Sequence, residues 1–568
     1  MGIKMTEKPN TNKSQSKEPQ VSQAEYQAML DAMAKQLVTQ RDAAFRANEL
    51  NNDIYTYLCD YFQIDYDPSL LHSGRKINKF YSSLNSVLQR YITSFIRNAY
   101  PRETKNFEFQ VTNDMVDSMS SLYSDSNKED VRHQLSVIFS EISNSVRREI
   151  DNSGFHDILP IIVSHYFVCH GAFLCMPSRP VLGAKSAIDL IPILPAELAL
   201  VFSNKQEIVQ AFYKYSDKQQ NESGAPIKPN KTICVSRKEQ QNPETGISSY
   251  YWEQAIIDEQ NNIIDIQNHP YNPIVVFYNV KFPYESMGRG VAFEQYRSIK
   301  EFDEFSKHAN RSKRYFANPP IALDSTSING FSSKDLRTLE PGDVLIMNNP
   351  SLPIKQLNTT DPTPYINDAN NQRIEITECI LGSVINQNPA TTATLTNEQV
   401  TSQQNFILQQ LGRGAKQLIE QIVMNSFHIL LQKGIIHETI RNFLLEDSNR
   451  LPYFLFNQME NANAATQESL INGFINAIVS LLAQPTGLHI SITSPLGLAF
   501  KGAQYSRLVE GVTRISQLTQ LPVNVLFNTN KLVNILADYS DLPPEVLSSE
   551  KERNAKIQQM MQQQVNQA

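Results

Sequence analysis

The fold is decided by residues 283–320, which read PYESMGRGVAFEQYRSIKEFDEFSKHANRSKRYFANPP. A glycine-containing turn opens this stretch, and the charged and apolar pattern after it predicts a helix over residues 290–316. Asn318, Pro319 and Pro320 end that helix, because proline lacks an amide donor and disfavours helix in the residue before it. Further on, a second long helix follows a polar loop. The chain thus places long helices around a compact insert, with no catalytic motif nearby.

The predicted helix over residues 290–316 has two different faces when its residues are placed at 100° intervals. One face spans about 60° and holds the basic residues Lys300, Lys307, Arg311 and Arg314. The opposite face is apolar and holds Ile299, Phe302, Phe305, Ala309 and Phe316. An ordinary amphipathic helix with a solvated charged face gives the same pattern. The basic face therefore assigns no function by itself.

The insert and the helix after it are predicted from turn and cap residues. Residues 317–360 contain short apolar runs separated by Pro341 and Gly342, which predicts a small α/β insert. Asp361 is a suitable N-cap and Pro362 a suitable first-turn residue. We therefore expect a second helix over residues 361–382.

Residues 383–395 are small, polar and uncharged, so they predict an exposed loop. Its polar side chains include Asn386, Gln387, Asn388, Thr391, Thr392 and Thr394. Thr396 and Gln399 form a capping box, and an apolar stripe continues from there, which predicts a long helix over residues 396–434. Gly412 and Gly414 lie in its middle, where each glycine costs roughly 1 kcal/mol relative to alanine. We expect a kink there.

The first half of the chain predicts an α+β fold that is mainly helical. Helical spacing runs through residues 23–61 and again through 74–150. Four apolar runs between residues 188 and 283 predict strands, at 190–194, 208–213, 232–235 and 273–278. Residues 158–176 approach the length of a membrane span, but they contain Pro160, His165 and His170, so we predict buried core instead.

Composition limits the functional classes. The chain has 568 residues, 41% of them hydrophobic, so several cores are possible. Its net charge of −7 argues against a protein coated with basic residues, and any DNA contact should be local or weak. Five scattered cysteines suggest neither a disulfide framework nor a Cys-based zinc site, and they favour synthesis in a reducing cytoplasm. Residues 1–22 lack the apolar region of a signal peptide and predict a disordered arm.

No catalytic signature is found in the sequence. The P-loop pattern, HExxH and GxSxG are absent, and the ten histidines show no metal-ligand spacing. His165 and His170 are interpreted as hydrogen-bonded core residues. We therefore expect no catalytic residues, no metal ligands and no cofactor, and an enzyme of an unrecognised type remains the alternative.

Two short motifs carry a resemblance to a known family. Tyr284 to Gly290, with Met287 where an aromatic residue is usual, resembles the segment ending in Tyr-Gly-Arg-Gly before the first stem helix of phage portal proteins. Thr396 to Val400 is similar to that family's Thr-Ala-x-Glu-Val, with Glu398 one place early. In the order and spacing of parts, residues 160–540 resemble the portal, or head-to-tail connector, of short-tailed, podovirus-type bacteriophages.

The resemblance implies a division of the chain into the parts of a portal fold. These parts are a disordered arm (1–22), a wing (23–289), the first stem helix (290–316), a clip (317–360), the second stem helix (361–382), a channel or tunnel loop (383–395), a long kinked helix (396–434), a wing return (435–502), and a short helical crown with a Gln-rich tail (503–568). Portals of this kind are dodecameric rings at one vertex of the capsid, made in the host cytoplasm.

The resemblance also implies partners. Double-stranded DNA passes through the ring without sequence specificity during packaging and ejection, the terminase large subunit docks first, and the tail adaptor follows. Major capsid and scaffolding or internal core proteins surround the ring, and no membrane is involved. Twelve copies of the basic face would form sparse rings of charge, which face the DNA or pair with acids of a neighbouring subunit. The polar loop either touches DNA weakly or is a linker that makes no contact.

The rival interpretation is another structural virion protein, such as a tail adaptor or an internal core protein. Adaptors are usually much shorter and lack the order of stem, insert, stem, loop and long helix. That order is the feature that discriminates between the two.

Overall fold

The structure is a computed structural model, and it describes most of the chain. The described residues are 23–64, 82–102, 104–122, 128–178, 185–203, 207–215, 231–241, 248–280, 285–319, 321–324, 344–347, 354–356, 361–385, 397–446, 464–482, 489–494, 508–517 and 532. They form an α+β fold that is mainly helical, as predicted.

The helical part surrounds one large apolar core. Its N-terminal helices are α1 (Gln23–Phe62), α3 (Ser82–Ala99), α4 (Asn113–Leu122), α5 (Lys128–Asn152) and α6 (Phe155–Val168). The predicted stripe of α3 is buried, including Leu84, Tyr91 and Phe95. Its apolar residues recur every three or four positions, so they share one side of the helix and can face the core together. The core therefore follows directly from the helical periodicity.

The strands form separate sheets beside this core. An antiparallel sheet with the order β4-β5-β6-β7-β8 comprises Leu198–Phe202, Ile208–Tyr215, Lys231–Gln241, Ser248–Ile257 and Ile263–His269. A second antiparallel sheet with the order β3-β2-β9 comprises Ile188–Ile193, His170–Pro177 and Ile274–Tyr278. These two sheets share an apolar cluster, and α1 packs on the five-stranded sheet through a second cluster. The four predicted strands are confirmed as β3, β5, β6 and β9.

The apolar stretch 158–176 is buried, as predicted, and it changes from helix to strand within its length. Helix α6 ends at Val168 and β2 begins at His170, with Cys169 between them at φ −138° and ψ −91°. Over the described part of the chain, no helix is long and apolar enough to cross a membrane. Periodicity did not reveal this change, because both elements are largely buried and read as one apolar run.

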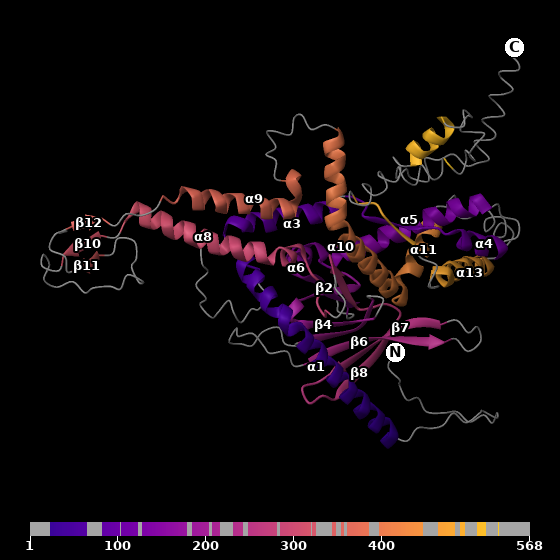
Figure 1. Ribbon diagram of the computed structural model, residues 1–568. Coiled ribbons are helices and arrows are strands. Elements are labelled where there is room, and N and C mark those ends of the chain that lie inside the picture. The colour runs from indigo at the N-terminus through magenta and orange to yellow at the C-terminus, as the bar shows by residue number, and fades with distance from the viewer. Residues whose placement is uncertain are drawn as a thin grey trace, which may run out of the picture.

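A helical hairpin projects from the body, with a small sheet at its tip (Figure 1). Helix α8 (Tyr296–Ala317) leads outward and α9 (Thr363–Ile385) returns beside it, and we call these two helices the projecting hairpin. The tip sheet has the order β11-β10-β12, with strands Val344–Met347, Ile321–Asp324 and Ile354–Gln356. The predicted α/β insert thus contains three described strands, and β10 lies parallel to β11.

The ends of the hairpin helices differ from the predicted ones. The helix expected over 290–316 is divided into α7 (Val291–Glu294) and α8, because Gln295 leaves the helical conformation at φ −92° and ψ 10°. Helix α9 begins at Thr363 rather than at 361. The reason is that Asp361 acts as a side-chain cap: its Oδ1 accepts hydrogen bonds from the backbone N–H of Thr363 at 2.9 Å and from its hydroxyl at 2.7 Å. These two bonds also lower the pKa of Asp361.

Helix α10 (Asn397–Gln432) is the long helix expected after the loop, and it changes direction along its length in Figure 1. Gly414 has a packing reason as well: a Cβ there would overlap the hydroxyl of Tyr166. The glycine therefore allows α10 to approach the side chain of Tyr166, on α6, closely.

A row of amide side chains fixes α10 to the outer edge of β9. Gln421 accepts a hydrogen bond from the N–H of Val276 at 3.0 Å and donates one to its carbonyl at 3.1 Å. One turn away, Gln417 accepts from the N–H of Tyr278 at 3.2 Å. These residues lie on one side of the helix, and β9 is an edge strand whose outward amides need partners. The amide side chains of α10 take the place of a missing neighbouring strand.

The remaining elements return to the body. Helices α11 (Ile435–Glu446) and α13 (Ala464–Leu482) pack together, and α11 also packs on α5. Strand β13 (His489–Ile492) pairs with β1 (Phe107–Gln110), although the two are far apart in the chain. A further helical segment lies within 508–517. The expected arm 1–22 and all but 508–517 and 532 of the expected crown 503–568 lie outside the described residues.

We predict that Gln421→Leu lowers the free energy of unfolding by about 1–3 kcal/mol, because a buried backbone donor and acceptor lose their partner. Gln432→Leu is the matched control: it lies exposed at the end of the same helix, and its effect should stay within about 0.5 kcal/mol. Chemical denaturation of both variants measures the difference. Equal stabilities would mean that the amide row does not hold α10 in place.

Candidate functional site

The projecting hairpin is attached to the body by the turn Gly288-Arg289-Gly290. A Cβ on Gly290 would overlap the backbone carbonyls of Tyr166 and Phe167, and one on Gly288 would lie 2.5 Å from Cβ of Tyr278. No other residue type fits such a close approach of two segments of the chain. The two glycines of the motif are thus explained by packing against the end of α6 and against β9.

Backbone hydrogen bonds fix the same turn. The N–H of Gly290 donates to the carbonyl of Val168 at 3.2 Å, and the N–H of Arg289 donates to the carbonyl of Val280 at 2.7 Å. The guanidinium of Arg289 is paired with Glu285 and lies 5.1 Å from the centre of the Phe293 ring. Arg289 therefore shapes the turn and the start of α7. Because these contacts are made within the turn and the helix that follows it, Arg289 is a structural residue of the motif.

A buried polar cluster lies directly beneath this turn. The thiol of Cys169 donates a hydrogen bond to the carbonyl of Gly288 at 3.0 Å, and Nδ1 of His170 lies 3.1 Å from the sulfur. Nδ1 of His165 lies 3.1 Å from the hydroxyl of Tyr55. Both histidines are buried core residues with hydrogen bonds, as predicted. Nε2 of each ring has no partner among the described residues.

Burial keeps these two histidines neutral. It lowers the pKa of His165 from 6.5 to about 4, and it lowers the pKa of His170 to about 3, with the nearby His165 as a smaller cause. Within the described part of the chain, no group of three His, Cys, Asp or Glu residues is placed to hold a metal ion. The cluster packs directly against the turn that anchors the hairpin, since the Cys169 thiol is bonded to Gly288.

The four predicted basic residues all lie exposed on α8, but they are not equivalent. Lys307 forms an ion pair with Asp303, whose side chain is only 5% exposed. Arg311 donates to the hydroxyl of Tyr315 at 3.3 Å, and its guanidinium lies 5.6 Å from the centre of that ring. Lys307 thus neutralises a buried carboxylate one helical turn away on the same helix.

Charge is distributed unevenly along the hairpin. The basic residues of α8 are Arg297, Lys300, Lys307, Arg311, Lys313 and Arg314, and its acidic residues are Glu301, Asp303 and Glu304. All three acids lie in the half of α8 near the body, so the outer half is purely basic. Helix α9 has the opposite balance, with Asp368, Glu375 and Glu378 against Arg373. Basic residues also compensate the negative end of a helix dipole, which explains part of the pattern at the C-terminus of α8.

The apolar side of α8 is only partly covered. Ile299, Phe302 and Ala309 are buried, as the helical wheel predicts, but Phe305 and Phe316 are exposed. The prediction that these two phenylalanines are packed together with the rest of the apolar face was wrong: within the chain, their side chains are exposed. On α9, Tyr365 and Ile374 are exposed as well. The exposed fraction is 54% for Phe316 and 47% for Ile374, which is high for large apolar side chains on a slender projection.

The structure does not describe the position of the predicted loop residues. Asn386, Gln387, Asn388, Thr391, Thr392 and Thr394 all lie outside the described residues. The described chain reaches Ile385 at the end of α9 and resumes at Asn397 in α10.

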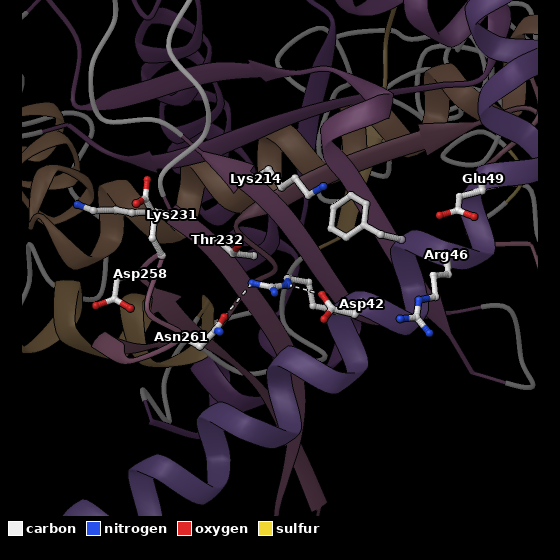
Figure 2. Close-up of a pocket in the computed structure, with 11 residues that line it drawn as sticks. Asp42, Arg46, Glu49, Lys214, Lys231, Thr232, Asp258 and Asn261 are labelled. Atoms are coloured by element: carbon white, nitrogen blue, oxygen red, sulfur yellow. Dashed lines mark hydrogen bonds and ion pairs between the residues drawn. The ribbon is translucent and has the colours of Figure 1, made fainter.

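A cavity of about 470 Å³ lies between α1 and the five-stranded sheet (Figure 2). No sequence pattern indicated it, because its residues come from α1, β5, β6 and the turn after β7. Arg41 is paired with Asp42 at 2.9 Å and reaches Asn261 at 3.5 Å, while the ammonium of Lys214 lies 4.0 Å from the centre of the Phe45 ring. The contacts to Asn261 and Lys214 join α1 to the sheet and its turn, whereas the pair with Asp42 lies within α1. The lining holds four basic and four acidic residues, so the cavity has no charge preference for a ligand.

No protein-family model matches this chain, and no curated protein shows significant similarity to it.

The buried histidines predict a pH dependence of stability. Because their folded pKa values are lowered, the unfolded chain binds more protons below pH 6.5, so stability is complete above about 6.5 and falls as the pH decreases towards 4. Each buried histidine lowers the free energy of unfolding by about 1.4 kcal/mol per pH unit in that range, which amounts to about 2 kcal/mol at pH 5.

Comparing variants isolates this effect from the titration of carboxylates. The loss of unfolding free energy between pH 7.5 and pH 5 should be about 2 kcal/mol smaller in His170→Gln than in the unchanged protein. His133→Gln, at an exposed position, is the control and should show the full loss. Identical pH profiles for all three proteins would contradict a neutral, buried His170.

Proposed function

We propose that this chain is the portal protein of a short-tailed bacteriophage, forming the ring-shaped channel at one capsid vertex for DNA packaging and ejection. The observation that carries the proposal is the projecting hairpin, anchored at the Gly288-Arg289-Gly290 turn, tipped by a three-stranded sheet and followed by long α10. In this proposal α8 and α9 are the stem helices and the tip sheet belongs to the clip. The channel loop predicted over residues 383–395 is shortened to 386–395, because α9 continues to Ile385.

The exposed apolar residues support assembly of several copies. A two-helix projection with Phe305, Phe316, Tyr365 and Ile374 exposed does not bury its own apolar surface. Packing such projections side by side in a closed ring would remove these side chains from water. We propose a homododecamer on the family resemblance.

Charge supports the same arrangement. The outer half of α8 is basic, and Asp368 lies in the outer half of α9, so α8 of one subunit next to α9 of its neighbour would bring this acid towards the basic residues and offset them in part. Basic residues not used in this way would face the channel. A sparse basic lining in an acidic protein suits a duplex that must slide, since strong phosphate binding would hold it in place.

The partners follow from the parts. The clip would dock the terminase large subunit and later the tail adaptor, and the body would contact major capsid and scaffolding or internal core proteins. The protein would be made in the host cytoplasm and reside at one vertex of the virion. The protein would contact only the phosphate backbone of the double-stranded DNA, so the DNA would pass without sequence specificity.

The second candidate is a tail adaptor or an internal core protein. Exposed apolar residues on a projection also fit that role, because such proteins dock onto others. A closed ring of about twelve subunits formed by the chain alone favours the portal, whereas a monomer that binds a preformed ring favours the adaptor.

Assembly through the hairpin can be measured by light scattering together with negative-stain imaging. Twelve copies of the 64.5 kDa chain should give a ring of about 770 kDa with a central hole. Phe316→Ser combined with Ile374→Asn should raise the concentration needed for half-assembly by about tenfold or more, because each side chain contributes roughly 1 kcal/mol when buried.

The control for that pair is Leu445→Asn, since Leu445 is similarly exposed but lies on α11, outside the hairpin. It should leave assembly unchanged. A small oligomer without a hole, or equal sensitivity of assembly to both changes, would count against a ring closed by the hairpins.

DNA binding by the basic face is tested with neutral variants of its outermost residues. Arg311→Gln combined with Arg314→Gln should leave rings intact and weaken binding of non-specific duplex DNA. The dependence of log affinity on log salt should fall by about 1 for each phosphate that is no longer neutralised. Lys313→Gln is the matched control, because Lys313 is exposed on the other side of the same helix.

Loss of rings in the double variant would show that Arg311 and Arg314 pair with a neighbouring subunit. Intact rings with an unchanged salt dependence would show that the basic face does not meet DNA.

A further inference from the structure

Tyr166 lies between the base of the projecting hairpin and the middle of α10. A Cβ on Gly290, at the base, would overlap the backbone carbonyl of Tyr166. A Cβ on Gly414, in α10, would overlap the hydroxyl of the same tyrosine. Two segments more than a hundred residues apart in sequence therefore press on opposite ends of one residue, and a glycine makes each close approach possible.

The ring of Tyr166 has no room to move aside. It is fully buried, and its centre lies 4.9 Å from that of Phe277, 5.4 Å from Phe95 and 6.4 Å from Tyr91. Close-packed interiors transmit a displacement because they have few voids to absorb it. A shift of α10 at Gly414 must therefore move the ring together with its backbone.

The backbone of Tyr166 in turn controls how the hairpin leaves the body. Gly290 is the residue before α7, and its N–H is bonded to Val168 at the end of α6. Its carbonyl accepts from the N–H of Glu294 at 3.3 Å, which is the first turn of α7. Any displacement of Tyr166 and its neighbours thus reaches the start of the helices that lead into the hairpin.

Helix α10 is also hydrogen-bonded to the body beside Gly414, and not merely packed. Gln417 and Gln421 attach the helix to β9 directly after Gly414, and Phe277 of that same strand packs on the Tyr166 ring. Helix α10 can move at Gly414 only by moving β9 or Tyr166, so its position is strongly defined at this point.

We propose that Tyr166 is a positioning residue that couples α10 to the base of the projecting hairpin, so that a displacement of α10 at Gly414 is transmitted to residues 288–299. The coupling goes beyond the proposed function, because it requires neither a ring nor DNA. In a portal it would connect the segment that precedes α10 with the stem.

Hydrogen exchange of the purified full-length chain, read by mass spectrometry over peptides covering residues 285–300, tests the coupling. Gly414→Ala should speed exchange of these peptides by about tenfold or more, because overpacking changes a local opening equilibrium by that order. Gly473→Ala is the matched control: Gly473 also lies within a helix, α13, and a Cβ there meets nothing within 4 Å. It should leave residues 285–300 unchanged.

The reciprocal variant keeps the test decisive, since energetic coupling acts equally in both directions. Gly290→Ala should speed exchange in peptides covering residues 412–425 of α10. In a Tyr166→Leu background, which lacks the atoms that meet Gly414, the effect of Gly414→Ala on residues 285–300 should fall by at least about threefold. Faster exchange confined to α6 and α10 in Gly414→Ala, or an undiminished effect in the Tyr166→Leu background, would overturn the coupling.

Discussion

The close approach of the Gly288-Arg289-Gly290 turn to the end of α6 is the constraint on which the projecting hairpin depends. The backbone of Gly290 lies against the carbonyls of Tyr166 and Phe167, and its N–H is bonded to Val168. A slender two-helix projection has little core of its own, so its direction is set where it is attached. That attachment is buried and hydrogen-bonded, which makes the hairpin an extension of the body and not a loosely linked arm.

Helix α10 depends on the same region through a different kind of contact. Its amide side chains satisfy the outer edge of β9, while Gly414 lets it touch Tyr166. Hydrogen bonds to an edge strand have directional requirements, and close packing tolerates almost no overlap. Together they define the position of α10 more sharply than an apolar stripe alone would. The hairpin and α10 are thus both positioned against α6, although the sequence separates them widely.

Much of the fold was predictable because its signals are local. The apolar stripe of α3, the proline stop after α8 and the strands at 208–213 and 273–278 each follow from residues within one element. Two features could not be predicted in this way, because they depend on what packs nearby. They are the interruption of the helix at Gln295 and the exposure of Phe305 and Phe316. Strand β1 was missed because its partner, β13, lies near the other end of the chain. For the basic face, helical spacing placed four residues on one side of α8, but the burial of Asp303, which engages Lys307, could be seen only in three dimensions.

The pairing of Lys307 with Asp303 changes how the basic face should be understood. If this lysine moved away, the carboxylate would remain buried without a partner, and an unpaired buried charge is strongly destabilising. Lys307 therefore belongs to the packing of α8, and the exposed residues of the basic face farther out on the same helix are Arg311 and Arg314. There α8 has no acids of its own, and Phe316 and Tyr365 are exposed. The outer end of the projecting hairpin thus presents apolar and basic side chains together, because the acids that balance the basic residues of α8 all lie in its half near the body.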